Sequence, residues 1–115
     1  MTDLEKLQQA VIKFRDERDW KQFHNPKDEA IALVEEAVEL LEMFRWKTEA
    51  ESREFLKTNS EEISEEVIDV LHWALLIAHD YGVDIEKAFD RKMKKNILKY
   101  PVSKSRGNPT KYTKL

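Results

Sequence analysis

The sequence has no cysteine and very little glycine or proline, with two glycines and three prolines among 115 residues. Without cysteine the chain forms neither disulfides nor thiolate metal sites, which suits a reducing cytoplasmic location. Glycine and proline are the residues that most often interrupt helices, so their scarcity favours long uninterrupted helices.

Long apolar runs are also missing. No stretch near the start resembles a signal peptide, and none elsewhere has the roughly 20 apolar residues of a membrane-spanning helix. We therefore expect a soluble, cytoplasmic protein without a membrane partner.

Charge is distributed unevenly along the chain. Residues 91–115 contain nine Lys or Arg and no Asp or Glu, which leaves residues 1–90 with 11 basic and 23 acidic residues, a net charge of −12. An acidic body can hold cations, and a basic tail can hold phosphates or can simply be solvated. The body would repel a phosphate backbone, so we expect no nucleic-acid partner.

The residues that are abundant indicate an all-α protein. Charged residues make up 37% of the chain, and Leu, Glu, Lys and Ala are frequent. Apolar spacings of three and four predict four to five helices, with residues 47–57 as either a short helix or a loop. The long helices are expected at about 4–18, 26–46, 59–81 and 85–99. We predict a helical domain over residues 1–100 and a basic tail over 101–115.

Capping residues mark the expected helix boundaries. Asn25 followed by Pro26 predicts the start of the second helix, and Thr58 with Glu61 offers a capping box for the long helix that follows. Further boundaries are expected at Gly82, Asp84 and Pro101.

Two of these helices each carry a pair of acids among apolar neighbours. Residues three apart differ by about 60° around a helix axis, so Glu36 and Glu39 point the same way, as do Glu66 and Asp69. None of the four has a lysine four residues later, the usual pattern of a solvated acidic face. Burying carboxylates without a counter-charge costs several kcal/mol each, a cost that a bound cation removes. Four oxygen donors predict a hard ion, Mg²⁺ or Mn²⁺.

Two other interpretations apply to the same acids. Glutamates on amphipathic helices are usually solvated surface residues. A di-iron bundle needs Glu-x-x-His from two helices, whereas this chain has only Asp69-x-x-His72. The residues alone leave the metal site and the solvated surface open, and they argue against di-iron.

Aromatic residues accompany the acidic motifs. Trp20 and Trp46 flank the second helix, and Trp73 lies one turn after Asp69. Such rings can stack on a nucleobase, an interaction worth roughly 1–3 kcal/mol per base, or they can fill the core. The phenylalanines at positions 14, 44, 55 and 89 are assigned to the core, and His72 and His79 to structural or surface positions.

The stretch "EEAVE" at 35–39, followed 26 residues later by "EVID" at 66–69, resembles the EExxE…ExxD motif of the all-α nucleotide pyrophosphohydrolases, the MazG-like superfamily. More specific matches resemble its dCTP pyrophosphatase branch. These are "FRDERDWKQFHNP" at 14–26, "FRWK" at 44–47, "KMKKNILKYPV" at 92–102 and "SRGNPTKYTKL" at 105–115. Together they span nearly the whole chain.

The resemblance implies Mg²⁺-dependent hydrolysis of the bond between the α and β phosphates of a nucleoside triphosphate, by direct attack of water and without a covalent intermediate. It favours dCTP and modified dCTP; the alternatives are dUTP, phosphoribosyl-ATP, a broad range of triphosphates, or a helical adaptor that catalyses nothing. It also implies an intertwined homo-oligomer, a dimer or a dimer of dimers.

The resemblance assigns roles to individual residues as well. The metal-binding and catalytic residues are Glu36, Glu39, Glu66 and Asp69, and Glu35 falls outside direct coordination. The pyrimidine pocket is expected at Trp20, His24, Trp46 and Trp73. The phosphates are expected to bind Lys92 and Asn96, with Arg106 and Lys111 closing over them from the same or a neighbouring subunit. The sequence departs from the family at Trp73, where tyrosine is familiar, and at Val11, where the family has a histidine.

Overall fold

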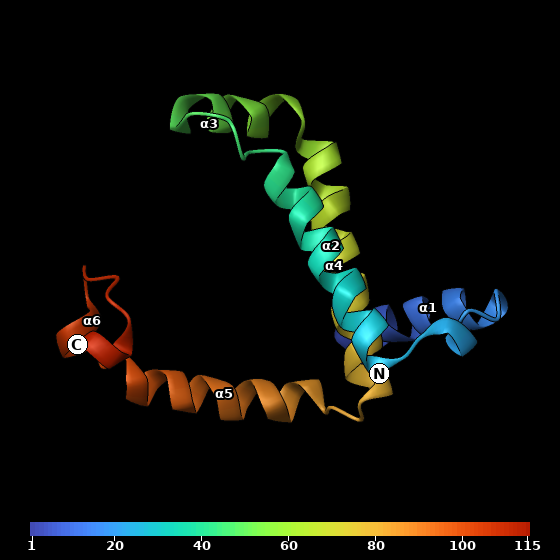
Figure 1. Cartoon of the computed structure of the whole chain (residues 1–115). Coiled ribbons are helices and arrows are strands. Elements are labelled where there is room, and N and C mark those ends of the chain that lie inside the picture. Colours follow the sequence, from blue (N-terminus) through green and yellow to red (C-terminus); the bar gives the residue numbers. More distant parts are fainter. The chain divides into compact units, whose positions relative to one another are not determined.

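The computed structural model describes all residues, 1–115, and contains helices but no strands (Figure 1). This confirms the predicted all-α class. The first of two compact units, Met1–Tyr81, holds α1 (Asp3–Glu17), the short η1 (Lys21–Phe23), α2 (Pro26–Glu42), α3 (Glu49–Thr58) and α4 (Ser60–Asp80). The second, Gly82–Leu115, holds α5 (Ile85–Lys99), α6 (Val102–Ser105) and η2 (Tyr112–Lys114). Along the chain the boundary between the units falls between Tyr81 and Gly82, and the assignment of a domain over residues 1–100 stays a prediction.

Side-chain caps start most of the helices. The Asn25 side chain accepts the backbone N–H of Asp28 at 3.0 Å, with Pro26 in the first turn of α2. Asp84 likewise accepts the N–H of Lys87 at 3.1 Å and starts α5. Gly82 has a φ of 71°, just after α4 ends. These three predicted boundaries are confirmed, because each depends only on local backbone geometry.

Other predicted boundaries are wrong. The capping box of this region belongs to Thr48 and Glu51 and starts α3, whereas Thr58 is the last residue of α3 and donates its hydroxyl hydrogen to the Glu54 carbonyl. Helix α4 therefore begins after Asn59 without a side-chain cap. Helix α2 ends at Glu42, several residues before Trp46. The segment predicted as a basic tail, residues 101–115, contains α6 and η2.

Helix α4 is the centre of the first unit and packs against α2, α1 and α3, most extensively against α2 (Figure 1). It contributes Leu75, Leu76 and Ala78 to the buried core, and α1 adds Ile12. Phe44 and Phe55 are half-buried and meet edge to face with ring centroids 5.7 Å apart. The core prediction was wrong for Phe14 and Phe89, whose side chains are exposed.

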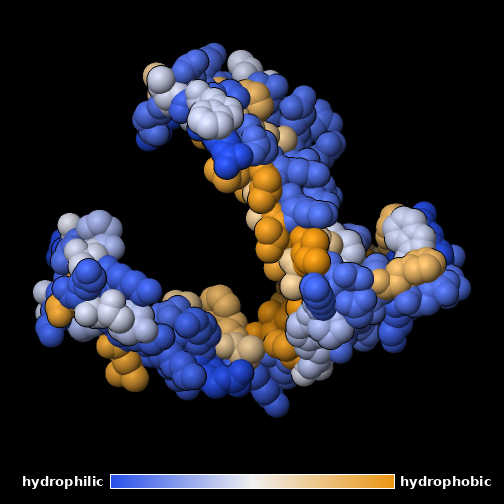
Figure 2. All heavy atoms as spheres, viewed as in Figure 1, coloured by the Kyte–Doolittle hydropathy of each residue, from blue (hydrophilic) through white to orange (hydrophobic).

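Much of the apolar surface is left uncovered. Figure 2 shows hydrophobic atoms along the α2–α4 pair, and helix α2 contributes a stripe at spacings of three and four. This exposed stripe consists of Ile31, Val34, Val38 and Leu41. Apolar patches of this kind mark interaction surfaces on soluble proteins. None of the helices combines the length and the apolar character needed to cross a bilayer.

Leu76→Ala should destabilise the first unit strongly. The Leu76 side chain is 0% exposed, and removing a buried leucine side chain costs about 2–5 kcal/mol through lost burial and the cavity that remains. Urea unfolding followed by circular dichroism measures this. The matched control is Leu7→Ala on α1, where the side chain is half exposed and a clearly smaller loss is expected. Equal losses for the two variants would contradict the assignment of Leu76 to the centre of the core.

Candidate active site

The packing of α2 against α4 brings four acidic side chains together. Each of Glu36, Glu39, Glu66 and Asp69 offers one carboxylate oxygen, and these four oxygens all lie within 4.8 Å of one another. Glu36 and Glu66 are partly buried, whereas Glu39 and Asp69 are exposed. The predicted convergence of these four side chains is therefore confirmed. Glu35 is exposed and lies outside this group.

Burial and the neighbouring carboxylates both disfavour the ionised forms of Glu36 and Glu66. Burial raises the pKa of Glu36 to about 7, with further contributions from a hydrogen bond to Glu39 and from the charges of Glu39, Asp69 and Glu66. Burial, followed by the charge of Glu39, also raises the pKa of Glu66. One buried oxygen of Glu36 and one of Glu66, Oε2 in each, have no hydrogen-bond partner.

No basic side chain balances this charge. None of the ion pairs in the structure includes any of the four carboxylates. The group therefore needs either bound protons or a cation, and its donors are all carboxylate oxygens, the ligands that Mg²⁺ and Mn²⁺ prefer. The two buried oxygens without partners fit the same conclusion, because they are free to coordinate.

An aromatic cavity of about 470 Å³ adjoins this group. Asp69 belongs both to the four-carboxylate group and to the cavity wall. The rest of the wall comes from α1, from the segment before η1 and from α4. These other lining residues are Ala10, Val11, Phe14, Trp20, His72 and Trp73. Flat apolar walls beside a group of carboxylates can hold a ring system while its charged substituents reach a cation.

The rings of the cavity wall contact one another, two pairs edge to face and one pair tilted. The ring of Phe14 meets those of Trp20 and His72 at centroid distances of 5.7 and 6.0 Å, and His72 meets Trp73 at 5.9 Å. The Arg18 guanidinium covers the Phe14 ring at 3.8 Å. Burial lowers the pKa of His72, although the charge of Asp69 raises it. The imidazole therefore stays neutral in neutral solution and acts as an aromatic wall.

The structure brings only some of the predicted base-binding residues together. Trp20 and Trp73 share the aromatic cavity, and His24 contacts Trp73 with ring centroids 5.1 Å apart. Trp46 lies beyond the end of α2, is 86% exposed, and is not among the cavity-lining residues. Within one chain, Trp46 is therefore a surface ring outside the cavity, with the Arg45 guanidinium 5.6 Å from its centroid.

The predicted phosphate-binding residues all belong to the second unit. Lys92 and Asn96 lie one turn apart on one face of α5, and Arg106 and Lys111 follow in the segment around α6. Their role beside the carboxylates stays a prediction.

Two residues of the cavity were not predicted there from the sequence. Phe14 was placed in the core, which is wrong, whereas the structural or surface position predicted for His72 agrees with its place in the cavity wall. The spacing carried a signal for His72, since it lies three residues after Asp69 and so faces the same side of α4. Phe14 had no such signal, because its position depends on how α1 packs against α4.

Comparisons with known proteins agree with this geometry. The MazG-like family matches residues 31–115. dCTP pyrophosphatase 1 of Rattus norvegicus is 40% identical over 114 residues, which cover 97% of this chain and 67% of that protein. dCTP pyrophosphatase 1 of Homo sapiens is 37% identical, again over 97% of this chain and 67% of that protein. The crystal structure of a pyrophosphatase from Archaeoglobus fulgidus superposes with a TM-score of 0.81 at 36% identity, covering 88% of this chain and 94% of that one. The chain therefore belongs to the MazG-like family.

Proposed function

We propose that this protein is a Mg²⁺-dependent nucleoside triphosphate pyrophosphohydrolase that cleaves dCTP and modified dCTP to the monophosphate and pyrophosphate. The observation that carries the proposal is that Asp69 belongs both to the four-carboxylate group and to the wall of the aromatic cavity. A base in the cavity and a polyphosphate at the carboxylates would thus be parts of one ligand. The relatives named dCTP pyrophosphatase 1 support the choice of substrate.

The role of the four carboxylates is to hold the cations. Glu36 and Glu39 approach from α2, and Glu66 and Asp69 approach from α4, so the two packed helices fix the spacing of the ligands. Bound Mg²⁺ would supply positive charge for the phosphate oxygens and lower the pKa of a water molecule. Water oxygen would bond to the attacked phosphorus as that phosphorus loses its bond to the bridging oxygen. The proton lost by the water would pass to solvent, and the monophosphate and pyrophosphate would separate. No side-chain nucleophile is needed.

The role of the aromatic cavity is to place the base. The rings of Trp20 and Trp73 offer flat faces, and their edge contacts through Phe14 and His72 keep them from collapsing onto each other. Stacking alone accepts any base, so the preference for cytosine must come from the size of the cavity and from polar groups at its edge. Trp73 is larger than the tyrosine expected from the family and so narrows this space.

We also propose that the working protein is a homo-oligomer. The exposed stripe on α2 and the exposed Trp46 ring support this, because both are apolar surfaces that a second copy would cover. In such an assembly Trp46, Lys92, Asn96, Arg106 and Lys111 would complete the site around the base and the phosphates. The three basic residues and Asn96 all carry N–H groups suited to phosphate oxygens.

Replacing a metal-binding carboxylate should abolish most of the activity. Asp69→Asn and Glu36→Gln each keep the shape of the side chain but remove a charged ligand, so kcat for pyrophosphate release with Mg²⁺ and dCTP should fall at least about 100-fold. Glu54→Gln on α3 is the matched control, since Glu54 is exposed and outside the group, and it should be unchanged. A wild-type protein that releases no pyrophosphate from any triphosphate of a panel would refute the proposed activity.

Removing a wall of the cavity should weaken substrate binding. Trp73→Ala takes away a stacking surface worth roughly 1–3 kcal/mol, which corresponds to a rise in KM for dCTP of roughly 5- to 150-fold. Trp73→Tyr should retain most of the affinity, because a flat ring remains. Steady-state kinetics with dCTP measures both variants. If KM were the same for Trp73→Ala and the wild type, the base would have to bind elsewhere.

The stability of the metal-free protein should depend on pH through Glu36. The folded-state pKa of about 7 lies above the ordinary value of 4.5, so the folded state binds more protons between these values, and stability falls as pH rises through this window. Glu36→Gln should reduce this fall, and Mg²⁺ should offset it in the wild type by binding the ionised form. Melting temperatures in EDTA and in Mg²⁺ from pH 4.5 to about 8 measure the effect. Glu29 has a similarly raised pKa, so part of the fall should persist in the variant.

A further inference from the structure

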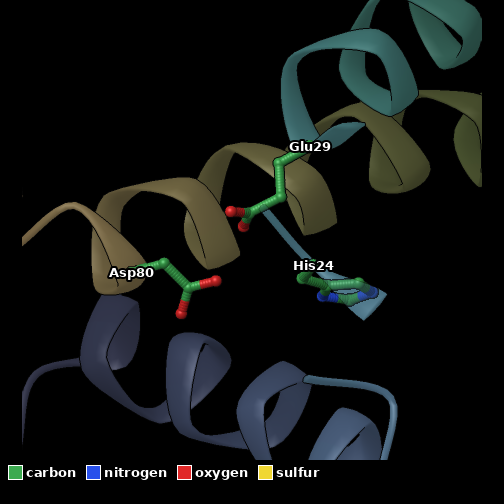
Figure 3. A group of neighbouring side chains, drawn as sticks. All are labelled: His24, Glu29 and Asp80. Atoms are coloured by element: carbon green, nitrogen blue, oxygen red, sulfur yellow. The ribbon is translucent and has the colours of Figure 1, made fainter. Parts of the chain in front are cut away.

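A second group of potential ligands lies in the first unit, away from the four carboxylates (Figure 3). His24 follows η1, Glu29 is in the first turn of α2, and Asp80 is the last residue of α4. One ligand atom from each of them lies within 4.8 Å of the others. In Figure 3 the Glu29 carboxylate points toward that of Asp80, and the His24 ring lies beside them.

Each of these three side chains has a buried atom without a hydrogen-bond partner. These atoms are Nδ1 of His24, Oε2 of Glu29 and Oδ1 of Asp80. Glu29 is only 2% exposed, so bulk water does not solvate its carboxylate. Buried polar atoms are nearly always paired, so these three unpaired atoms indicate a missing partner. Nε and Nη2 of Arg15, which contacts Asp80, are unpaired as well.

The charges of the group also call for a further cation. The Arg15 guanidinium, 1% exposed, donates to Oδ2 of Asp80 at 2.6 Å and balances one of the two carboxylates. Glu29 remains, and burial, followed by the interactions with Asp80, raises its pKa to about 7. Burial lowers the pKa of His24, and the charge of Arg15 lowers it further. The imidazole is therefore neutral, which is the form that binds metals.

A single proton explains this arrangement less completely than a metal ion does. A proton shared by Glu29 and Asp80 would balance the charge and pair two of the three atoms, but it would leave His24 Nδ1 without a partner. A metal ion could coordinate one atom of each of the three side chains. Arg15 also pairs with Asp16 at 3.5 Å, so a divalent ion would bring the group and its charged neighbours to a net charge of zero. An open coordination position could then take water or a further ligand.

There is room for such a ligand. A cavity of about 310 Å³ is lined by all three side chains together with Lys21, Pro26, His79 and Tyr81. Lys21 adds positive charge to it, and the Tyr81 hydroxyl donates to the Pro26 carbonyl at 2.9 Å, which ties the end of α4 to the start of α2.

We propose that His24, Glu29 and Asp80 form a second metal site, selective for a first-row transition ion such as Zn²⁺ over Mg²⁺. One imidazole with two carboxylates suits a borderline ion, whereas the four-carboxylate group suits a hard one. Arg15 holds Asp80 in position from behind, as outer-shell partners of metal ligands commonly do. Because His24 contacts Trp73, the bound ion would also fix one wall of the aromatic cavity.

Calorimetric titration of the full chain tests the site independently of catalysis. The background carries Glu36→Gln and Asp69→Asn, which disable the four-carboxylate group, and the titrants are Zn²⁺ and Mg²⁺. We expect one equivalent of Zn²⁺ to bind, with at least about 10-fold selectivity over Mg²⁺ and with proton release that declines above pH 7. Adding Glu29→Gln or His24→Gln should weaken Zn²⁺ binding at least about 10-fold.

His79→Gln is the matched control, because His79 lines the same cavity but is not one of the three ligands, and Zn²⁺ affinity should be unchanged. Glu29→Gln keeps the shape of a protonated Glu29 and should fold, which circular dichroism checks. Absence of Zn²⁺ binding in the background protein would overturn the proposal and favour the shared proton. Binding that is unaffected by both Glu29→Gln and His24→Gln would overturn it as well. The Mg²⁺-dependent release of pyrophosphate is measured separately, so either result leaves the proposed function standing.

Discussion

The mutual repulsion of four carboxylates between α2 and α4 is the constraint on which the rest of the structure depends. Packing the two helices side by side brings these charges close together, and no basic side chain of the chain pairs with them. Burial, and after it the neighbouring carboxylates, raise the pKa values of Glu36 and Glu66. Packing energy from the core of α4 thus holds the acids in an unfavourable arrangement, which a cation makes favourable.

The sequence predicted this group because helical spacing is a local property. Three-residue spacing within each helix fixes the direction of each acidic pair, and the apolar residues around them indicate that both pairs face another helix. The caps at Asn25 and Asp84 were predictable for the same reason. Two Thr-x-x-Glu stretches lie near α3, however, beginning at Thr48 and at Thr58. Their local sequences do not show that Thr48 caps a helix whereas Thr58 is the last residue of one.

Sequence patterns could not reveal the second group, because its members come from separate segments. Glu29 lies in the first turn of a helix, where acids are common for electrostatic reasons and are usually solvated. Its burial depends on Arg15 of α1 and Asp80 of α4, and therefore on how three helices pack. The same dependence explains the error at Phe14, which lines a cavity formed where α1 meets α4.

The two acidic groups on the α2–α4 pair differ in how their negative charge is balanced. Glu29 and Glu36 are seven residues apart on α2, and Asp69 and Asp80 are eleven apart on α4, so each pair lies within about 20° of one face of its helix. The α2–α4 pair therefore carries two layers of acids. Arg15 enters one layer and balances half of its charge, whereas no side chain enters the other. The layer without an arginine, that of the four carboxylates, adjoins the aromatic cavity. A cation from solution can therefore bind there together with a ligand in the cavity. An arginine at that layer would stabilise the fold but would remove the need for the ion on which the proposed chemistry depends.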